Sequence, residues 1–130
     1  MSSAAELRPF ERTRPFVAVL YDVPLLGEAV RSALEFAEVQ TFAAAGRDLD
    51  GLLRWLHADA IVVDNVAAAD EAAAFAREHE LPVVHLSVEE RVLRLFRRGA
   101  WHVVGNGEDP TPEAIRNVVA GALFARGSAG

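Results

Sequence analysis

Polar side chains that could do chemistry follow four apolar segments of this sequence. Asp22, Asp64 and Ser87 each come directly after a run of mostly apolar residues, and Asn106 lies in the loop after another. If these runs are parallel strands, their carboxyl ends bring the four side chains to one edge of the sheet, where ligands gather in open α/β folds. Two carboxylates there could hold a hard cation such as Mg²⁺, and a hydroxyl could contact a phosphoryl oxygen. The sequence therefore predicts a weak Mg²⁺ site at Asp22 and Asp64.

The same residues also have purely structural interpretations. Asp22 can satisfy the start of the helix expected after it, and Asp64 with Asn65 can serve turn chemistry, since both residue types tolerate left-handed conformations. Ser87 stands three residues before Glu90, which is the spacing of a capping box at the start of a helix. Both kinds of interpretation stay open on the sequence alone.

The segments that would position these residues alternate between strand and helix patterns. Continuous β-branched runs indicate strands buried on both faces, as in parallel sheets covered by helices, and amphipathic stretches lie between them. The expected strands are 15–21, 39–43, 60–63, 82–86 and 101–104, and the expected helices are 25–37, 49–56, 67–80, 88–98 and 112–126. Each crossover is long enough for a right-handed βαβ unit. This pattern predicts an α/β, flavodoxin-like doubly wound fold, with a five-stranded parallel sheet in the order 2-1-3-4-5 and helices on both faces.

The length of 130 residues suits a single domain. We expect this domain to span residues 14–126, after a loose arm over 1–13 and before a flexible tail or linker over 127–130. The N-terminus lacks the basic start and apolar core that would indicate a signal peptide. No apolar run approaches the roughly 18 residues of a membrane helix. These features predict a cytoplasmic protein.

Composition excludes several classes of site. There is no cysteine, which excludes disulfides and thiolate metal sites, and all 13 basic residues are arginine, which excludes lysine chemistry. The net charge of −6 argues against sequence-independent binding of nucleic acid by this domain. None of the four histidines has metal-ligand spacing. His85 lies inside an expected strand, where a buried, neutral side chain is predicted.

The ordered set of segments resembles the receiver domain of bacterial response regulators over residues 14–125. Segment 17–26, Val-Ala-Val-Leu-Tyr-Asp-Val-Pro-Leu-Leu, resembles the first strand and acidic turn of that family. Segment 59–64 resembles the strand that ends in the phosphoacceptor aspartate, here Asp64, and segment 82–87 resembles the strand that ends in the switch hydroxyl, here Ser87. The Gly99-Ala100 pair resembles the one before the fifth strand. The resemblance implies a regulatory domain of a two-component system.

Several positions depart from the receiver pattern. The first of two adjacent acids is Tyr21, the lysine that ends the fifth strand aligns with Asn106, and the proline after it is Gly107. The aromatic switch residue aligns with Val103. The resemblance therefore implies an atypical receiver with a weakened metal site and no cation to pair with a phosphoryl group.

The expected helix over 88–98 is rich in arginine and is followed closely by a tryptophan. In receivers, the face made by the fourth helix, the fifth strand and the fifth helix is a common dimer surface. The resemblance thus implies a homodimer or a protein partner at this face. The expected contact residues are Arg91, Leu93, Arg94, Arg98 and Trp101.

These observations together predict a regulatory module that acts by protein–protein contact, with weak or no aspartyl phosphorylation and no enzymatic activity. It could stand alone or precede a DNA-binding domain beyond residue 130, with a histidine kinase as one partner. Two alternatives stay open: a conventional phosphoacceptor that switches through Asp64, and a flavodoxin-like domain that binds a small molecule at the same edge of the sheet.

Overall fold

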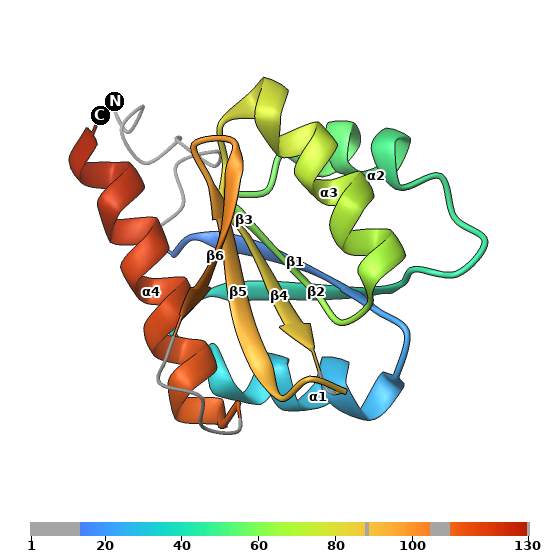
Figure 1. Cartoon of the computed structure of the whole chain (residues 1–130), viewed down its shortest axis with the longest axis horizontal. Coiled ribbons are helices and arrows are strands. Elements are labelled where there is room, and N and C mark those ends of the chain that lie inside the picture. The colour runs from blue at the N-terminus through green and yellow to red at the C-terminus, as the bar shows by residue number, and fades with distance from the viewer. Residues whose placement is uncertain (1–13, 88, 105–109, 130) are drawn as a thin grey trace, which may run out of the picture.

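Four parallel strands, β2-β1-β3-β4, form one side of a six-stranded sheet in the order β2-β1-β3-β4-β5-β6 (Figure 1). The structure, a computed structural model, describes residues 14–87, 89–104 and 110–129. The strands are β1 (Phe16–Tyr21), β2 (Glu38–Ala43), β3 (Ala60–Val63), β4 (Val83–Ser87), β5 (Val92–Arg97) and β6 (Ala100–Val104), and the helices are α1 (Pro24–Ala33), α2 (Leu49–Leu56), α3 (Val66–His79) and α4 (Pro112–Ala129).

The β1–β4 part of the sheet confirms the predicted order 2-1-3-4 and its parallel pairing. The two faces of the sheet carry separate cores. Val17 and Val19 of β1 pack with α1 and α4, whereas Leu20 packs with α2 and α3 on the opposite face. All four residues of β3 are buried, which explains why this strand reads as a continuous apolar run.

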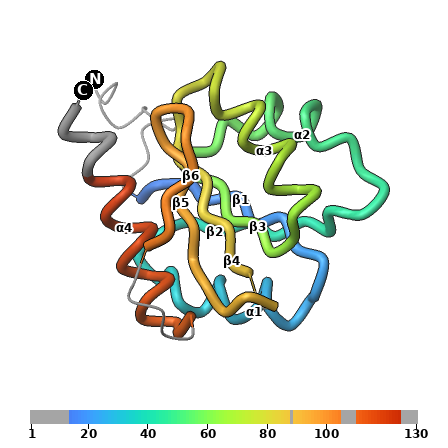
Figure 2. Tube along the Cα trace, in the orientation of Figure 1, coloured from blue at the N-terminus to red at the C-terminus, as the bar shows by residue number. Residues whose placement is uncertain are grey.

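The segment after β4 contradicts the predicted helix over 88–98. Its residues form a turn and then β5, which pairs antiparallel with β4, and β6 pairs antiparallel with β5. The tube in Figure 2 follows this chain as it reverses twice at one side of the sheet. The sheet is therefore mixed, with six strands instead of five parallel ones, and the order predicted after β4 is wrong.

Burial on both faces explains why this segment is a strand. Leu93 and Leu95 point into the core under α1 and α4, whereas Phe96 points into the core under α2 and α3, and all three are buried. A helix over 88–98 would have one narrow buried stripe. Leu93, Leu95 and Phe96 could not all lie on such a stripe. Alternation of side chains along a strand buries all three at once.

The turn residues also favour the hairpin. Arg98 and Gly99 join β5 to β6, and both have positive φ angles, 54° and 79°, as a type I′ hairpin turn requires. At the other end of β5, Ser87 Oγ accepts a hydrogen bond from the backbone N–H of Glu90 at 3.2 Å, as the capping box predicts. Arg91 then takes a φ of 56° and ends this single turn before a helix can form.

The C-terminal helix agrees with the sequence at its start and extends further at its end. Thr111 Oγ1 accepts from the N–H of Ala114 at 3.0 Å and caps the helix. α4 continues to Ala129, so residues 127–129 of the expected tail are helical. Residues 1–13, the expected arm, lie outside the described residues. Within the described ranges, no helix is long and apolar enough to cross a membrane.

The hairpin turn makes a testable prediction at Arg98. A β-turn of this type prefers Asn-Gly, because asparagine tolerates a positive φ better than arginine does. We expect Arg98→Asn to raise the free energy of unfolding by about 0.5–1 kcal/mol in urea denaturation, since the strained position is relieved. In a helix ending near Arg98, the same change would lose helix propensity, so a decrease in stability would contradict the hairpin.

Candidate functional site

The carboxylate of Asp64 binds the backbone that follows β1. Its Oδ1 accepts a hydrogen bond from the N–H of Asp22 at 2.7 Å, and its Oδ2 accepts one from the N–H of Val23 at 3.0 Å. The structure thus places Asp22 and Asp64 at the same edge of the sheet. The contact joins the side chain of Asp64 to the backbone N–H of Asp22, however, and Asp22 itself is exposed.

Asn65 completes this arrangement from the first residue before α3. Its Nδ2 donates to Asp64 Oδ1 at 3.1 Å, while its Oδ1 accepts from the N–H of Ala68 at 2.8 Å and caps α3. The Asp64-Asn65 pair therefore serves turn chemistry, one of the two interpretations left open by the sequence. Asp64 receives three N–H donors, and the two from Asp22 and Val23 hold the end of β3 to the residues just before α1.

This geometry fits a structural carboxylate better than a metal ligand. N–H donors direct positive partial charge at both oxygens of Asp64, which is the polarity that a bound cation would itself supply. Within the described part of the chain, no group of three histidine, aspartate or glutamate side chains could hold a metal ion. Tyr21, which aligns with the first of the two receiver acids, lies against α1, where a Cβ added to Gly27 would be 3.1 Å from its ring.

A second carboxylate, which the sequence analysis did not single out, acts at the opposite end of β3. Asp59 Oδ2 accepts from the N–H of Phe16 at 2.8 Å, and the N–H of Asp59 donates to the carbonyl of Phe16 at 2.8 Å. Asp59 and Asp64 thus bracket β3 and tie both of its ends to the chain around β1. The sequence signal for this role is an acid on each side of a short apolar run. Acids are common beside strands, so this signal alone does not single out Asp59.

The other residues that align with the receiver pattern have three different outcomes. Ser87 is buried, and its hydroxyl accepts from Glu90 within the turn between β4 and β5. Asn106 and Gly107 lie outside the described residues. Val103, which aligns with the aromatic switch residue of the receiver pattern, lies on β6 and is 63% exposed.

His85 confirms the predicted buried histidine. It is 4% exposed and contacts Trp101 edge-on, with ring centroids 6.0 Å apart. Burial lowers the pKa of His85, and the charge of Arg94 on the neighbouring strand lowers it further. The ring is therefore held neutral, as a packing group between β4 and β6.

The predicted interface does not exist in the expected form, because the helix that carried it is a strand. Leu93 is 4% exposed and belongs to the core, so it cannot contact a partner. Arg94 lies on β5 and forms an ion pair with Glu90. Arg91 and Arg98 lie in the turns on either side of β5, and Trp101 packs on Phe96 with ring centroids 5.2 Å apart.

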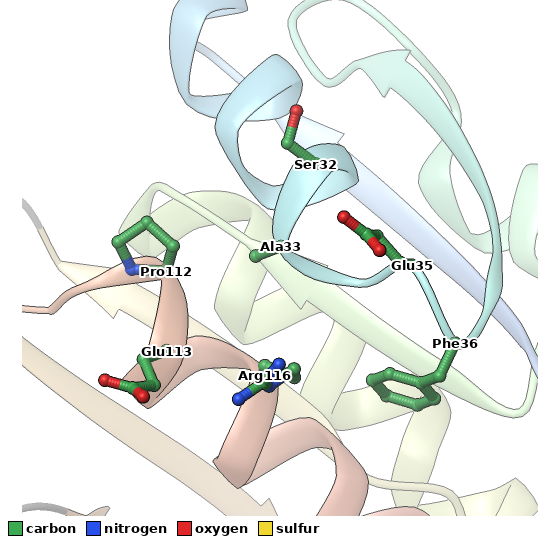
Figure 3. Close-up of a pocket in the computed structure, with 7 residues that line it drawn as sticks. All are labelled: Ser32, Ala33, Glu35, Phe36, Pro112, Glu113 and Arg116. Atoms are coloured by element: carbon green, nitrogen blue, oxygen red, sulfur yellow. The ribbon is translucent and has the colours of Figure 1, made fainter.

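Two surface hollows, one between α1 and α4 and one beside Tyr21, do not form a ligand site at the Asp64 edge. A hollow of about 610 Å³ separates the end of α1 from the start of α4, and Figure 3 shows Glu35 and Phe36 on one side of it and Glu113 and Arg116 on the other. It lies near the start of β1, because the residues that follow α1 lead to Glu38, whose N–H donates to the carbonyl of Pro15. A hollow of about 200 Å³ beside Tyr21 is nearer to Asp64, but it is smaller than the roughly 300–1,000 Å³ of typical ligand pockets.

Comparison with known proteins gives one informative match. No family model matches the chain, and no curated protein matches it. Among solved structures, it resembles a double mutant of the anti-anti-sigma factor PhyR from Bartonella quintana, with a TM-score of 0.62 and 15% sequence identity. The likeness shows the fold alone. The match covers 98% of this chain and 55% of that one, so this chain spans about half the length of PhyR in that structure. At the level of architecture it supports the α/β fold with a mostly parallel sheet.

Proposed function

We propose that this chain is a receiver-type regulatory module that acts through protein–protein contact, with weak or no phosphorylation of Asp64. The observation that carries this proposal is the engagement of both Asp64 oxygens by the N–H groups of Asp22 and Val23. The carboxylate that would accept a phosphoryl group instead fixes the backbone of the adjacent loop.

Phosphorylation would work against this arrangement in two ways. The attacking oxygen would have to give up its N–H donor as it becomes the bridging oxygen of an acyl phosphate. The product would then place about two negative charges beside Asp22, where the carboxylate carried one. A lysine would offset that charge in receivers, whereas Asn106 can donate a hydrogen bond but carries no charge.

The partners and setting that we propose follow from the same class. The structural neighbour is named as an anti-anti-sigma factor, and a name of that kind is consistent with regulation by protein contact. We propose a protein partner or a second copy of the chain, with a histidine kinase as a further candidate, in the cytoplasm and without direct nucleic-acid binding by this domain. We propose no enzymatic activity, and we expect Mg²⁺ to bind weakly.

The proposal predicts the outcome of incubation with acetyl phosphate and Mg²⁺. We expect the intact mass to show little or no added phosphate, because Asp64 is occupied by backbone donors. We also expect Mg²⁺ to change the fluorescence of the two tryptophans weakly. The matched control is Asp64→Asn, which should behave like the unchanged protein in both measurements.

The opposite result identifies the alternative. Stoichiometric phosphorylation that disappears in Asp64→Asn would identify a conventional phosphoacceptor and overturn the proposal. The small-molecule alternative predicts a bound ligand in native mass spectrometry, and the hollow of about 200 Å³ beside Tyr21 gives it little support.

A further inference from the structure

β6 presents an edge of the sheet that lacks the usual protection against strand pairing. It is the last strand in the sheet, and within the described ranges no strand pairs with its outer side. Its sequence, Ala-Trp-His-Val-Val, contains no proline and no aspartate, glutamate, lysine or arginine. Natural edge strands are commonly blocked by such residues, because unpaired backbone groups recruit other strands. The opposite edge, β2, begins with the exposed Glu38.

The hairpin fixes which backbone groups of β6 face outward. Arg97 and Ala100 flank a two-residue turn, in which the carbonyl of the first accepts from the N–H of the second. Hydrogen-bonded and non-hydrogen-bonded pairs alternate along an antiparallel ladder. Residues 100, 102 and 104 therefore direct their backbone groups toward β5. Trp101 and Val103 direct theirs toward the free edge.

We propose that β6 pairs antiparallel with β6 of a second copy of this chain, about a two-fold axis at His102. This inference deepens the proposed function by naming the partner and the contact. In this register, the outward groups of Trp101 face those of Val103 of the partner subunit, and the reverse pair forms by symmetry. The same two side chains then make an aromatic–β-branched cross-strand pair, which is favourable in sheets. Val103 is 63% exposed in the single chain, so the pairing covers apolar surface.

The charges at the two ends of the hairpin favour an antiparallel pair of copies over a parallel one. Arg97 and Arg98 lie at the turn where β6 begins. The turn near its end, placed by the pairing of Val104 with Leu93, holds Glu89, Glu90 and Arg91, and Glu90 is in an ion pair with Arg94. A two-fold axis reverses the second hairpin, so the basic turn of each copy approaches the turn of the other that carries the two glutamates. A parallel arrangement would place the two basic turns side by side. No charged residue lies on β6 itself to oppose the contact.

The first test is sedimentation of the full chain over a concentration series, with two matched variants. We expect a dimer of twice the 14.1 kDa chain mass. Val103→Glu should raise the dimer Kd by about tenfold or more, because it places a charge beside Trp101 of the partner subunit. Val66→Glu is the control, since Val66 is 64% exposed on α3 and acquires the same charge away from β6. Circular dichroism checks that both variants keep the fold.

The second test measures the register. The chain has no cysteine, so a single introduced thiol reports its own symmetry mate. Cα atoms of a directly opposed non-hydrogen-bonded pair are about 4.5 Å apart, within the range of a disulfide. His102→Cys should therefore cross-link two copies under mild oxidation. Ala100→Cys should not, because a four-residue offset from its mate separates the two thiols by roughly 14 Å.

These outcomes separate the contact from the proposed function. A chain that stays monomeric overturns the contact, as does a dimer that Val103→Glu leaves unchanged or that cross-links through Ala100→Cys instead of His102→Cys. None of these results bears on phosphorylation of Asp64. Stoichiometric phosphoryl transfer overturns the proposed function and leaves the edge contact standing.

Discussion

Replacing Asp64 with alanine should lower the free energy of unfolding by about 2 kcal/mol, because two backbone N–H groups lose an ionised acceptor. The groups are those of Asp22 and Val23, at 2.7 and 3.0 Å from the carboxylate oxygens. Each hydrogen bond to a charged group contributes about 1.5–3 kcal/mol when buried, and solvent at this exposed loop reduces that figure. Urea denaturation monitored by circular dichroism measures the loss.

Asp22→Ala is the matched control for this prediction. Asp22 contributes its backbone N–H to Asp64, and that group survives the change, while its side chain is exposed. We expect its effect to stay within about 0.5 kcal/mol. Asp64→Asn should fall between the two, since one amide oxygen still accepts a hydrogen bond. If Asp64→Ala and Asp22→Ala were equally stable, the carboxylate would not be holding the loop.

The position of Asp64 could be predicted from the sequence, whereas its role could not. Parallel strands end at one edge of a sheet, so an acid after β1 and an acid after β3 had to lie near each other. Which atoms they offer depends on where the backbone N–H groups of the β1–α1 loop point. Nothing in the residue types of Asp22 and Val23 encodes that direction. The structural alternative for Asp64-Asn65 rested on turn chemistry, and the hydrogen bonds support it.

The β1–β4 region could be predicted because its signals agree with one another. β1, β3 and β4 are apolar runs buried on both faces, β2 is a more polar edge strand, and each crossover has room for a helix. α2 and α4 begin at residue types that favour helix starts, since Asp48 and Thr111 accept backbone N–H groups at 3.2 and 3.0 Å. Local pattern and tertiary packing therefore point to the same structure.

The β4–β6 region could not be predicted because its local signals conflict. The capping-box spacing from Ser87 to Glu90 indicates a helix start, and its hydrogen bond does form. The alternation after Val92 and the Arg98-Gly99 pair indicate a hairpin, but arginine is an uncommon residue at a positive φ and hides that signal. Tertiary burial of Leu93, Leu95 and Phe96 on two faces decides the outcome.

The largest stability effect that we expect lies at Phe96, which the hairpin turns into the core. Its side chain is 2% exposed under α3, packs against Trp101 and lies 5.5 Å from the guanidinium carbon of Arg77. Phe96→Ala should lower the free energy of unfolding by about 3–4 kcal/mol, because it removes a large buried ring and leaves a cavity. Chemical denaturation followed by circular dichroism gives the value.

Phe124→Ala is the matched control, because this ring on α4 is 74% exposed and its removal leaves no cavity. We expect it to stay within about 0.5 kcal/mol of the unchanged protein. Phe96→Ala should also alter tryptophan fluorescence in the folded state, since Trp101 rests directly on the lost ring, whereas Phe124→Ala should not. A fully buried Phe96 in contact with Trp101 requires β5 and β6 to pair. A small loss of stability with unchanged fluorescence would therefore contradict the hairpin and, with it, the free edge that β6 presents.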